Sequence, residues 1–337
     1  MEAHIRPCVG LTHCMSEHRP ICAHNAATGR ETTMPHTITP ADGPARRVVV
    51  VGGGPAGLEA ARVCAERGHT VTLLEAAPQL GGQLRLAATA SWRKDVIGLV
   101  DWRALELERL GVEISMNVFA ETDTVQALDP DVVIIATGGV PDLDWLEGRE
   151  LVTDPWDTLS GDGAGAGEAM VYDGTGRHAA ASAAERFAMA GRTINYVAID
   201  DALTPEMPPS ERFTWKKRFY ELDIPCRFDQ QLLRVVRSGN RLVAVFENLV
   251  TTEIIEEEAD QIVVEHGTRP ADAIFHGLSG TASNHGVTDI DALLAGAPQP
   301  ADQNPDGAYA LYRIGDCVTS RNIPAAIYDA LRLFRTL

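Results

Sequence analysis

Short runs of consecutive apolar residues, each followed closely by glycines, alternate along the chain with stretches of helical periodicity. Residues 48–51 are four valines in succession, and the glycine-rich residues 52–57 follow them directly. A helical stretch then runs to Gly68, and a second apolar run occupies residues 71–74. Because continuous Val/Ile/Leu runs are typical of strands covered on both faces, this alternation predicts an α/β fold with a doubly wound sheet.

The same arrangement occurs a second time. Residues 170–172 lead through Asp173 into a second glycine-rich turn at residues 174–179. An alanine-rich helix and another apolar run, residues 193–199, follow that turn. We refer to residues 52–57 as the first turn and to residues 174–179 as the second turn. A duplicated pattern of this length is harder to obtain by chance than either half, so it indicates two dinucleotide-fold units.

A further match between the two halves sets the domain organisation. Residues 131–141 and 260–270 both begin with Asp, which leads an apolar strand, and both end in Pro. We therefore expect two doubly wound, Rossmann-like FAD/NAD(P)-binding domains, the second inserted in the first and both preceded by a short cysteine-containing segment. The expected boundaries are 1–45 for an iron–sulfur-type loop and linker, 46–160 with 268–337 for a discontinuous FAD-binding domain, and 161–267 for an NAD(P)H-binding domain.

Three connecting elements follow from periodicity alone. Apolar residues at helical spacing predict an amphipathic helix over residues 91–110 and a shorter helix over residues 213–222. Residues 232–236 and 242–246, joined by Ser-Gly-Asn, predict a β-hairpin.

The first turn has the residues that a diphosphate-linked nucleotide requires. Gly52 permits a tight turn, Gly54 lets the backbone approach a pyrophosphate, and Gly57 lets the helix lie close to the strand. The helix N-terminus offers N–H groups and a positive dipole end to the phosphates. Glu75, at the end of the next strand, is placed to accept hydrogen bonds from ribose hydroxyls. A structural glycine turn is the alternative.

Other segments are expected to complete a flavin nucleotide site. They are Gly82-Gln83, Thr137-Gly138 and Gly315-Asp316. The paired glycines at Gly82 would let the backbone pass against a ring or a pyrophosphate, and the alternative is a plain surface turn. Asp316 ends an apolar strand, where it could bond the sugar-like chain of a flavin nucleotide or cap a helix that starts near Pro324.

The second turn differs in one glycine. It keeps Gly174 and Gly176 but has Ala179 where the first turn has Gly57, which suits a pyridine nucleotide that binds and leaves. Asp200 ends the following strand, where a carboxylate favours a free ribose 2′-OH and so NADH over NADPH. The alternative is a degenerate nucleotide fold that binds nothing. No acid–base pair or nucleophile suggests a separate chemistry, so catalytic residues are unassigned.

Composition and charge exclude several partners. The formal net charge of −18 over 337 residues argues against nucleic acid and anionic membranes, because both demand basic patches. No apolar stretch approaches the ~20 residues of a membrane helix, and the N-terminus has no apolar signal core. We therefore expect a cytoplasmic protein.

Three of the six cysteines are close together: Cys8, Cys14 and Cys22. Thiolates grouped in a short loop could bind an iron–sulfur cluster, with His13 or His18 as a fourth ligand. Unliganded thiols are the alternative. The chain has no C-x-x-C, so a self-standing disulfide-type reductase is not favoured.

Several stretches resemble a known family. Residues 8–31, 263–268, 313–316 and 320–330 are similar to the iron–sulfur flavoenzymes related to old yellow enzyme. That family includes trimethylamine dehydrogenase, 2,4-dienoyl-CoA reductase and the dimethylglycine and N-methylproline (stachydrine) demethylases. The resemblance covers essentially the whole chain and is strongest to the demethylases.

The resemblance implies cofactors and a partner. Family members carry a (β/α)8 barrel with FMN, then a 4Fe–4S loop, then an FAD-type domain with an NAD-type domain inserted in it. By resemblance, Cys8, Cys14 and Cys22 would be cluster ligands, although Leu11 stands where many relatives have another cysteine. Only seven residues precede Cys8, so FMN is expected in a barrel domain or subunit that is a partner of this chain.

The resemblance also implies a role. The chain would be an electron-transfer module that passes electrons between NAD(P)H, FAD and an iron–sulfur cluster, for an FMN-dependent amine demethylase, dehydrogenase or enoate reductase. The alternative is a non-catalytic FAD- or ADP-binding docking module, or an inactive fragment. The substrate and the direction of electron flow are not readable from these residues.

Overall fold

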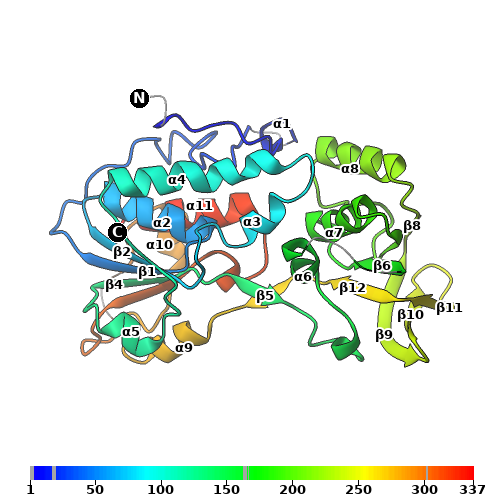
Figure 1. Ribbon diagram of the computed structural model, residues 1–337. Helices are drawn as coiled ribbons and strands as arrows, with labels where there is room; N and C mark the ends of the chain where they lie inside the picture. Colours follow the sequence, from blue (N-terminus) through cyan, green and yellow to red (C-terminus); the bar gives the residue numbers. More distant parts are fainter. Residues whose placement is uncertain (1–3, 17–19, 162–164, 166, 301–302) are drawn as a thin grey trace. The chain divides into compact units, whose positions relative to one another are not determined.

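The computed structural model describes residues 4–16, 20–161, 165, 167–300 and 303–337, and its chain divides into two compact units (Figure 1). Unit 1 comprises Met1–Arg85, Asp95–Val140 and Arg269–Leu337, and unit 2 comprises Leu86–Lys94 and Pro141–Thr268. His18, the second candidate for a fourth cluster ligand, lies outside the described residues. None of the helices formed by the described residues is long and apolar enough to cross a membrane.

Unit 1 is built on a five-stranded parallel sheet in the order β14-β4-β1-β2-β3. Its strands are β1 (Arg47–Val51), β2 (Thr70–Glu75), β3 (Glu113–Met116), β4 (Val132–Ile135) and β14 (Ala310–Arg313). Val50 pairs with Leu73 on one side and Ile134 on the other, and all three side chains are fully buried. The continuous apolar runs therefore form the centre of a doubly wound sheet, and the predicted fold class is confirmed.

Helices cover both faces of this sheet. The long helices α2 (Pro55–Glu66), α4 (Gly98–Arg109) and α11 (Ile323–Phe334) lie on one side, and the short helices α5 (Thr122–Gln126) and α9 (Ala273–Ser279) lie on the other (Figure 1). Alternate side chains of β1 point to opposite faces of the sheet. Val49 and Val51 point to the face covered by α5 and α9 and pack with those helices. The remaining helices of this unit are the short α1 (His13–Ser16), α10 (Ile290–Ala295) and η4 (Gly315–Cys317).

Unit 2 has a four-stranded parallel sheet in the order β12-β6-β7-β8. The strands are β6 (Glu168–Asp173), β7 (Thr193–Ala198), β8 (Cys226–Arg227) and β12 (Gln261–Glu265). On one face the alanines of α7 (His178–Met189) and the aromatic residues of α8 (Pro209–Glu221) form the core. On the other face lies an antiparallel sheet, with Phe246 packed near Tyr172. Helix α6 (Pro155–Ser160) and η3 (Arg149–Leu151) also belong to this unit.

The antiparallel sheet contains the predicted hairpin. Its strands β9 (Gln230–Ser238) and β10 (Arg241–Asn248) pair around Gly239, whose φ of +59° suits glycine. The hairpin prediction is confirmed, with longer strands than expected. A third strand, β11 (Ile254–Ala259), pairs with β10 and was not predicted, because three consecutive glutamates, which are depleted in strands, fill half of it.

The chain leaves and re-enters unit 1 through two short strands. These are β5 (Gly139–Pro141) and β13 (Thr268–Pro270), which pair in a two-stranded sheet. They terminate the two matched stretches noted in the sequence. The structure groups residues 141–160 with unit 2, whereas the expected boundary left them in the FAD-binding domain.

The predicted helix over residues 91–110 starts later than expected. Helix α4 begins at Gly98, after the single 3-10 turn η2 (Lys94–Ile97), and the short α3 (Gln83–Ala87) precedes it. Ser91 instead belongs to a loop, where its N–H and Oγ donate to the Glu185 carboxylate, at 3.0 and 2.6 Å. Residues 86–94 are therefore part of unit 2. The shorter predicted helix is α8, which begins at Pro209 instead of Phe213.

Candidate nucleotide sites and the cysteine segment

The first turn has the close approaches that its glycines predict. Gly52 has a φ of +107°, and a Cβ there would lie 2.4 Å from the carbonyl oxygen of Ala136. At Gly57 a Cβ would lie 1.9 Å from the Gly52 carbonyl oxygen, so only glycine lets α2 start this close to β1. Gly54 differs, because a Cβ there would meet nothing within 4 Å. Its missing side chain leaves open space, as a bound diphosphate would require.

Backbone donors are available at this turn. In the described part of the chain no acceptor meets the N–H groups of Gly54 and Ala56 at the start of α2. The Gly52 N–H is bonded to the Leu74 carbonyl at 2.8 Å and the Gly53 N–H to Glu75 at 2.6 Å. The unpaired amides and the positive end of the α2 dipole form an anion-binding arrangement.

Glu75 lies at the rim of the turn, where the sequence predicts it. Its two carboxylate oxygens accept from the Gly53 N–H at 2.6 Å and the Ala77 N–H at 2.7 Å. These bonds fix the carboxylate at the end of β2. Each oxygen retains a lone pair, so the group can still accept from ribose hydroxyls.

The other predicted flavin-site segments gather around the same turn. The Gly81 N–H donates to the Gly53 carbonyl at 2.8 Å, and the Cβ position of Gly82 is 3.5 Å from the Gly54 Cα. The Gln83 amide nitrogen is 3.9 Å from the Cβ position of Gly138.

Thr137 and Gly315 complete the gathering. The Thr137 hydroxyl donates to the Ala271 carbonyl at 2.6 Å, which ties the end of β4 to the returning chain. The Cβ position of Gly315 is 2.9 Å from the Cβ of Ala56. The structure therefore brings together four segments that are far apart in sequence.

Asp316 does not cap the last helix. Its Oδ1 accepts from the Arg321 N–H at 3.1 Å, whereas α11 is capped by Asn322, whose Oδ1 accepts from Ala325 N–H at 3.0 Å. The helix-cap alternative is thus wrong, because the chain travels six residues past Asp316 before α11 begins. The nucleotide-binding role of Asp316 stays a prediction.

The second turn is organised differently. The Asp173 carboxylate, at the end of β6, accepts from the Thr175 N–H and the Gly176 N–H, each at 3.0 Å. Asp173 is fully buried, and its other oxygen accepts from the Tyr196 hydroxyl at 2.5 Å. The predicted residues Gly174, Gly176 and Asp200 do lie together, but the N–H groups of Gly174, Thr175 and Gly176 already have acceptors within the protein. Sequence analysis missed Asp173; the signal was an acid where the first repeat has Val51.

Glu265, at the end of β12, provides a test of this buried acidic region. Burial, followed by the charge of Asp173, raises the pKa of Glu265 to about 7. Between pH 4.5 and about 7 the folded protein keeps this proton and the unfolded chain does not, so stability falls as pH rises through that window. Glu265→Gln should remove this component, roughly 3 kcal/mol across the window, in urea unfolding at successive pH values.

The control for this prediction is Glu256→Gln at an exposed position of β11. It should reproduce the wild-type pH dependence. Parallel pH profiles for wild type and Glu265→Gln would show that Glu265 does not titrate in this range.

The three N-terminal cysteines do not converge. Cys8 and Cys14 are exposed, Cys22 is half-buried, and all are free thiols. Among the described residues no group of three or more His, Cys, Asp and Glu side chains could bind a metal ion. Leu11 is buried, and its carbonyl oxygen accepts from His13 Nδ1 at 2.6 Å. The side chains as placed therefore do not fit a cluster.

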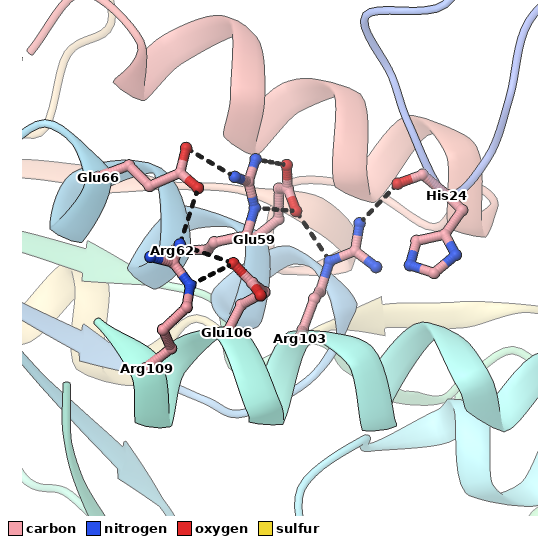
Figure 2. Close-up of polar contacts among 7 residues, drawn as sticks. All are labelled: His24, Glu59, Arg62, Glu66, Arg103, Glu106 and Arg109. Carbon is pink, nitrogen blue, oxygen red and sulfur yellow. Dashed lines mark hydrogen bonds and ion pairs between the residues drawn. The ribbon is translucent and has the colours of Figure 1, made fainter. Parts of the chain in front are cut away.

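A buried ionic network attaches the cysteine segment to unit 1. Figure 2 shows Glu59 on α2 between two arginines: its carboxylate is 2.7 Å from Arg62 Nη2 and 2.8 Å from Arg103 Nε. Burial alone would raise the pKa of Glu59, but the two guanidinium charges outweigh it and lower the pKa below its ordinary range. Arg103 Nη2 also donates to the His24 carbonyl at 3.1 Å.

His24 continues the attachment. Its Nδ1 donates to the Pro7 carbonyl at 2.9 Å, and burial with the charge of Arg103 lowers the pKa of His24 to about 4. Pro7 and His24 flank the cysteines on either side, so the ends of the segment are fixed on α4. Sequence analysis did not single out this network; its signal was charged residues in the otherwise apolar α2.

Comparisons with known proteins agree with this fold. Residues 18–166 match the family model described as pyridine nucleotide-disulphide oxidoreductase. The multifunctional alkene reductase/demethylase OYE of Caballeronia cordobensis is 46% identical over 98% of this chain and 49% of its own length. The probable N-methylproline demethylase of Rhizobium meliloti (strain 1021) is 44% identical over 100% of this chain and 50% of its own length.

A solved structure gives the same result. The 6-hydroxypseudooxynicotine amine oxidase from Pseudomonas geniculata N1 superposes with a TM-score of 0.84 at 26% identity, covering 99% of this chain and 49% of that protein. The chain spans about half the length of the curated relatives it matches. The resemblance to the demethylase branch is confirmed. Over nearly its whole length the chain is therefore similar to about half of these alkene reductase and demethylase relatives, and it has the pyridine nucleotide-disulphide oxidoreductase fold.

Proposed function

We propose that this chain is the FAD-binding electron-transfer part of a larger flavin-dependent oxidoreductase. The observation that carries the proposal is the first turn, with its unpaired amides at the start of α2 and open space at Gly54. Three other predicted segments gather around that turn. An arrangement of this kind fits a dinucleotide with a diphosphate at its centre.

Each residue has a role in this proposal. The Gly54 and Ala56 N–H groups bind the diphosphate, and Glu75 accepts from the ribose of the adenosine half. Gln83, Gly82, Thr137, Gly138, Gly315 and Asp316 position the flavin half. FAD bound there supplies reversible one- and two-electron chemistry.

The reaction class and partner come from the relatives. Two of them are named for demethylation, and one also for alkene reduction. We propose that the whole enzyme acts on an N-methyl amine or an alkene, with an FMN-binding barrel as partner domain or subunit and the cytoplasm as its compartment. The substrate would meet that partner.

The iron–sulfur cluster stays a prediction for Cys8, Cys14 and Cys22. Among the described residues the cysteine side chains do not converge on one point, and the electron path proposed for this chain does not include a cluster. Iron and sulfide analysis of protein purified without oxygen tests the prediction. Iron near four atoms per chain, lost in a Cys14→Ser variant, would support it.

A docking function is the second candidate. The closed second turn favours it, since unit 2 would then retain a nucleotide fold without its ligand. In that case unit 1 could bind ADP or FAD structurally while unit 2 contacts a partner.

FAD uptake followed by electron transfer from the bound flavin separates the two functions. We expect the purified chain, incubated with FAD and desalted, to remain yellow with about one flavin per chain. After reduction with dithionite it should pass electrons to an artificial acceptor such as ferricyanide. Tight binding of ADP by a chain that stays colourless would reject the electron-transfer proposal and support the docking function.

A further inference from the structure

The second turn already contains an anion, and that anion is part of the protein. Asp173 Oδ1 accepts from the Thr175 N–H at 3.0 Å, the Gly176 N–H at 3.0 Å and the Thr175 hydroxyl at 3.2 Å. The Gly176 N–H is the counterpart of the Gly54 N–H, which meets no acceptor among the described residues of the first turn and is therefore available to a diphosphate. At the first turn the corresponding position is Val51, which offers no such acceptor.

The two turns also differ in backbone conformation. At the first turn the positive φ is at the first glycine, Gly52, at +107°, whereas at the second turn it is at the second glycine, Gly176, at +63°. The Cβ position of Gly176 is 2.6 Å from Asp200 Oδ2 and 2.8 Å from Pro205 Cδ. Gly54, its counterpart, has open space there. Protein atoms therefore occupy the approach that the first turn leaves free.

Carboxylates surround this turn. Asp200 follows β7, and burial, then the charges of Asp173, Glu206 and Asp201, raise the pKa of Asp200. Glu265 faces Asp173 from β12, with Arg177 as a nearby countercharge. A diphosphate entering this region would meet the carboxylates of Asp173 and Asp200, whose repulsion opposes binding.

Tyr196 stabilises the arrangement in which the Asp173 carboxylate fills the second turn. Its buried hydroxyl donates to Asp173 Oδ2, so both carboxylate oxygens have partners. Displacing the carboxylate from the turn would leave it buried without the two N–H groups that it now accepts from. Such a loss of partners is costly for a buried charge.

We propose that Asp173 closes unit 2 to nicotinamide dinucleotides by serving as the permanent anionic ligand of its own turn. FAD bound to unit 1 is then not reduced by NADH. The inference rests on the proposed FAD site only for its optical readout, because dinucleotide binding to unit 2 is measured separately.

The test uses the full chain saturated with FAD, so that the first turn is filled. NADH is titrated in by calorimetry, and in a parallel anaerobic experiment the flavin absorbance is followed after adding excess NADH. We expect no binding heat and no loss of flavin absorbance, while dithionite bleaches the flavin. Saturable NADH binding, or flavin reduction by NADH, overturns the proposal. A sample that never takes up FAD instead rejects the proposed function, and its calorimetric titration is then repeated with ADP filling the first turn.

Two variants identify the residue responsible. Asp173→Ala frees the amides, and we expect NADH affinity to rise at least about tenfold. Asp201→Ala removes a neighbouring exposed carboxylate but leaves the amides bonded, and should give no gain. Equal gains in the two variants, or none in a folded Asp173→Ala protein, would contradict the role of Asp173. The wild-type titration decides the proposal even if Asp173→Ala does not fold.

Discussion

Replacing Glu59 with glutamine is expected to lower the free energy of unfolding by about 3–5 kcal/mol. The Glu59 carboxylate is 2% exposed and bonds Arg62 and Arg103, whose side chains are 3% and 0% exposed. Without the carboxylate charge, Arg103 keeps only neutral acceptors, which are the Leu99 and His24 carbonyls and the amide oxygen of the substituted side chain. Leaving a buried guanidinium without a counter-ion costs far more than breaking a surface ion pair.

Urea unfolding followed by circular dichroism measures this effect. The matched control is Glu66→Gln, two turns further along α2, where the side chain is 23% exposed and pairs with Arg62 at 3.0 Å. We expect the control to cost at most about 1 kcal/mol. If both variants lose the same small amount, the network of Figure 2 does not anchor the segment as described.

A pair of glycine substitutions at the first turn should separate folding from cofactor binding. Gly54→Ala adds a methyl group to open space, with φ at −76°, so the free protein should fold normally. That methyl lies where the diphosphate approaches, so FAD affinity should fall at least about tenfold. Gly57→Ala places a Cβ 1.9 Å from the Gly52 carbonyl and forces α2 away from β1.

For Gly57→Ala we expect both a lower stability of the free protein and a weaker affinity for FAD. Overpacking of this kind costs about 1–3 kcal/mol, and the displaced helix no longer presents its N-terminus to the diphosphate. Thermal unfolding without FAD and fluorescence titration with FAD measure the two effects on the same samples. Normal FAD binding by a stable Gly54→Ala protein would show that the diphosphate does not lie at this turn.

The first turn could be predicted from sequence because its requirements are local. A valine run, three spaced glycines and an acid at the end of the next strand lie within residues 48–75, and the structure places them accordingly. The segments around Gly82, Gly138 and Gly315 were also found, since each follows a strand or turn with its own glycine pattern. The parallel sheet follows from the same apolar runs.

Other features depend on contacts that sequence spacing does not reveal. Glu59 and Arg103 lie on different helices, and nothing local to either helix indicates that they meet. The assignment of residues 86–94 to unit 2 depends on Ser91 meeting Glu185, 94 positions away. The role of Asp173 was hidden because the glycine pattern beside it suggested a ligand, whereas the carboxylate itself fills the turn.

The contribution of residues 86–94 to unit 2 limits how the protein could be dissected. Because β5 and β13 pair, a short loop joining residues 141 and 268 would remove the residues between them. Trp92, however, packs edge-on against Trp215 at a centroid distance of 5.3 Å, and Arg93 is buried. Excision would expose Trp92 and Arg93 to water. The shortened polypeptide would then be prone to aggregation unless residues 86–94 were redesigned as well.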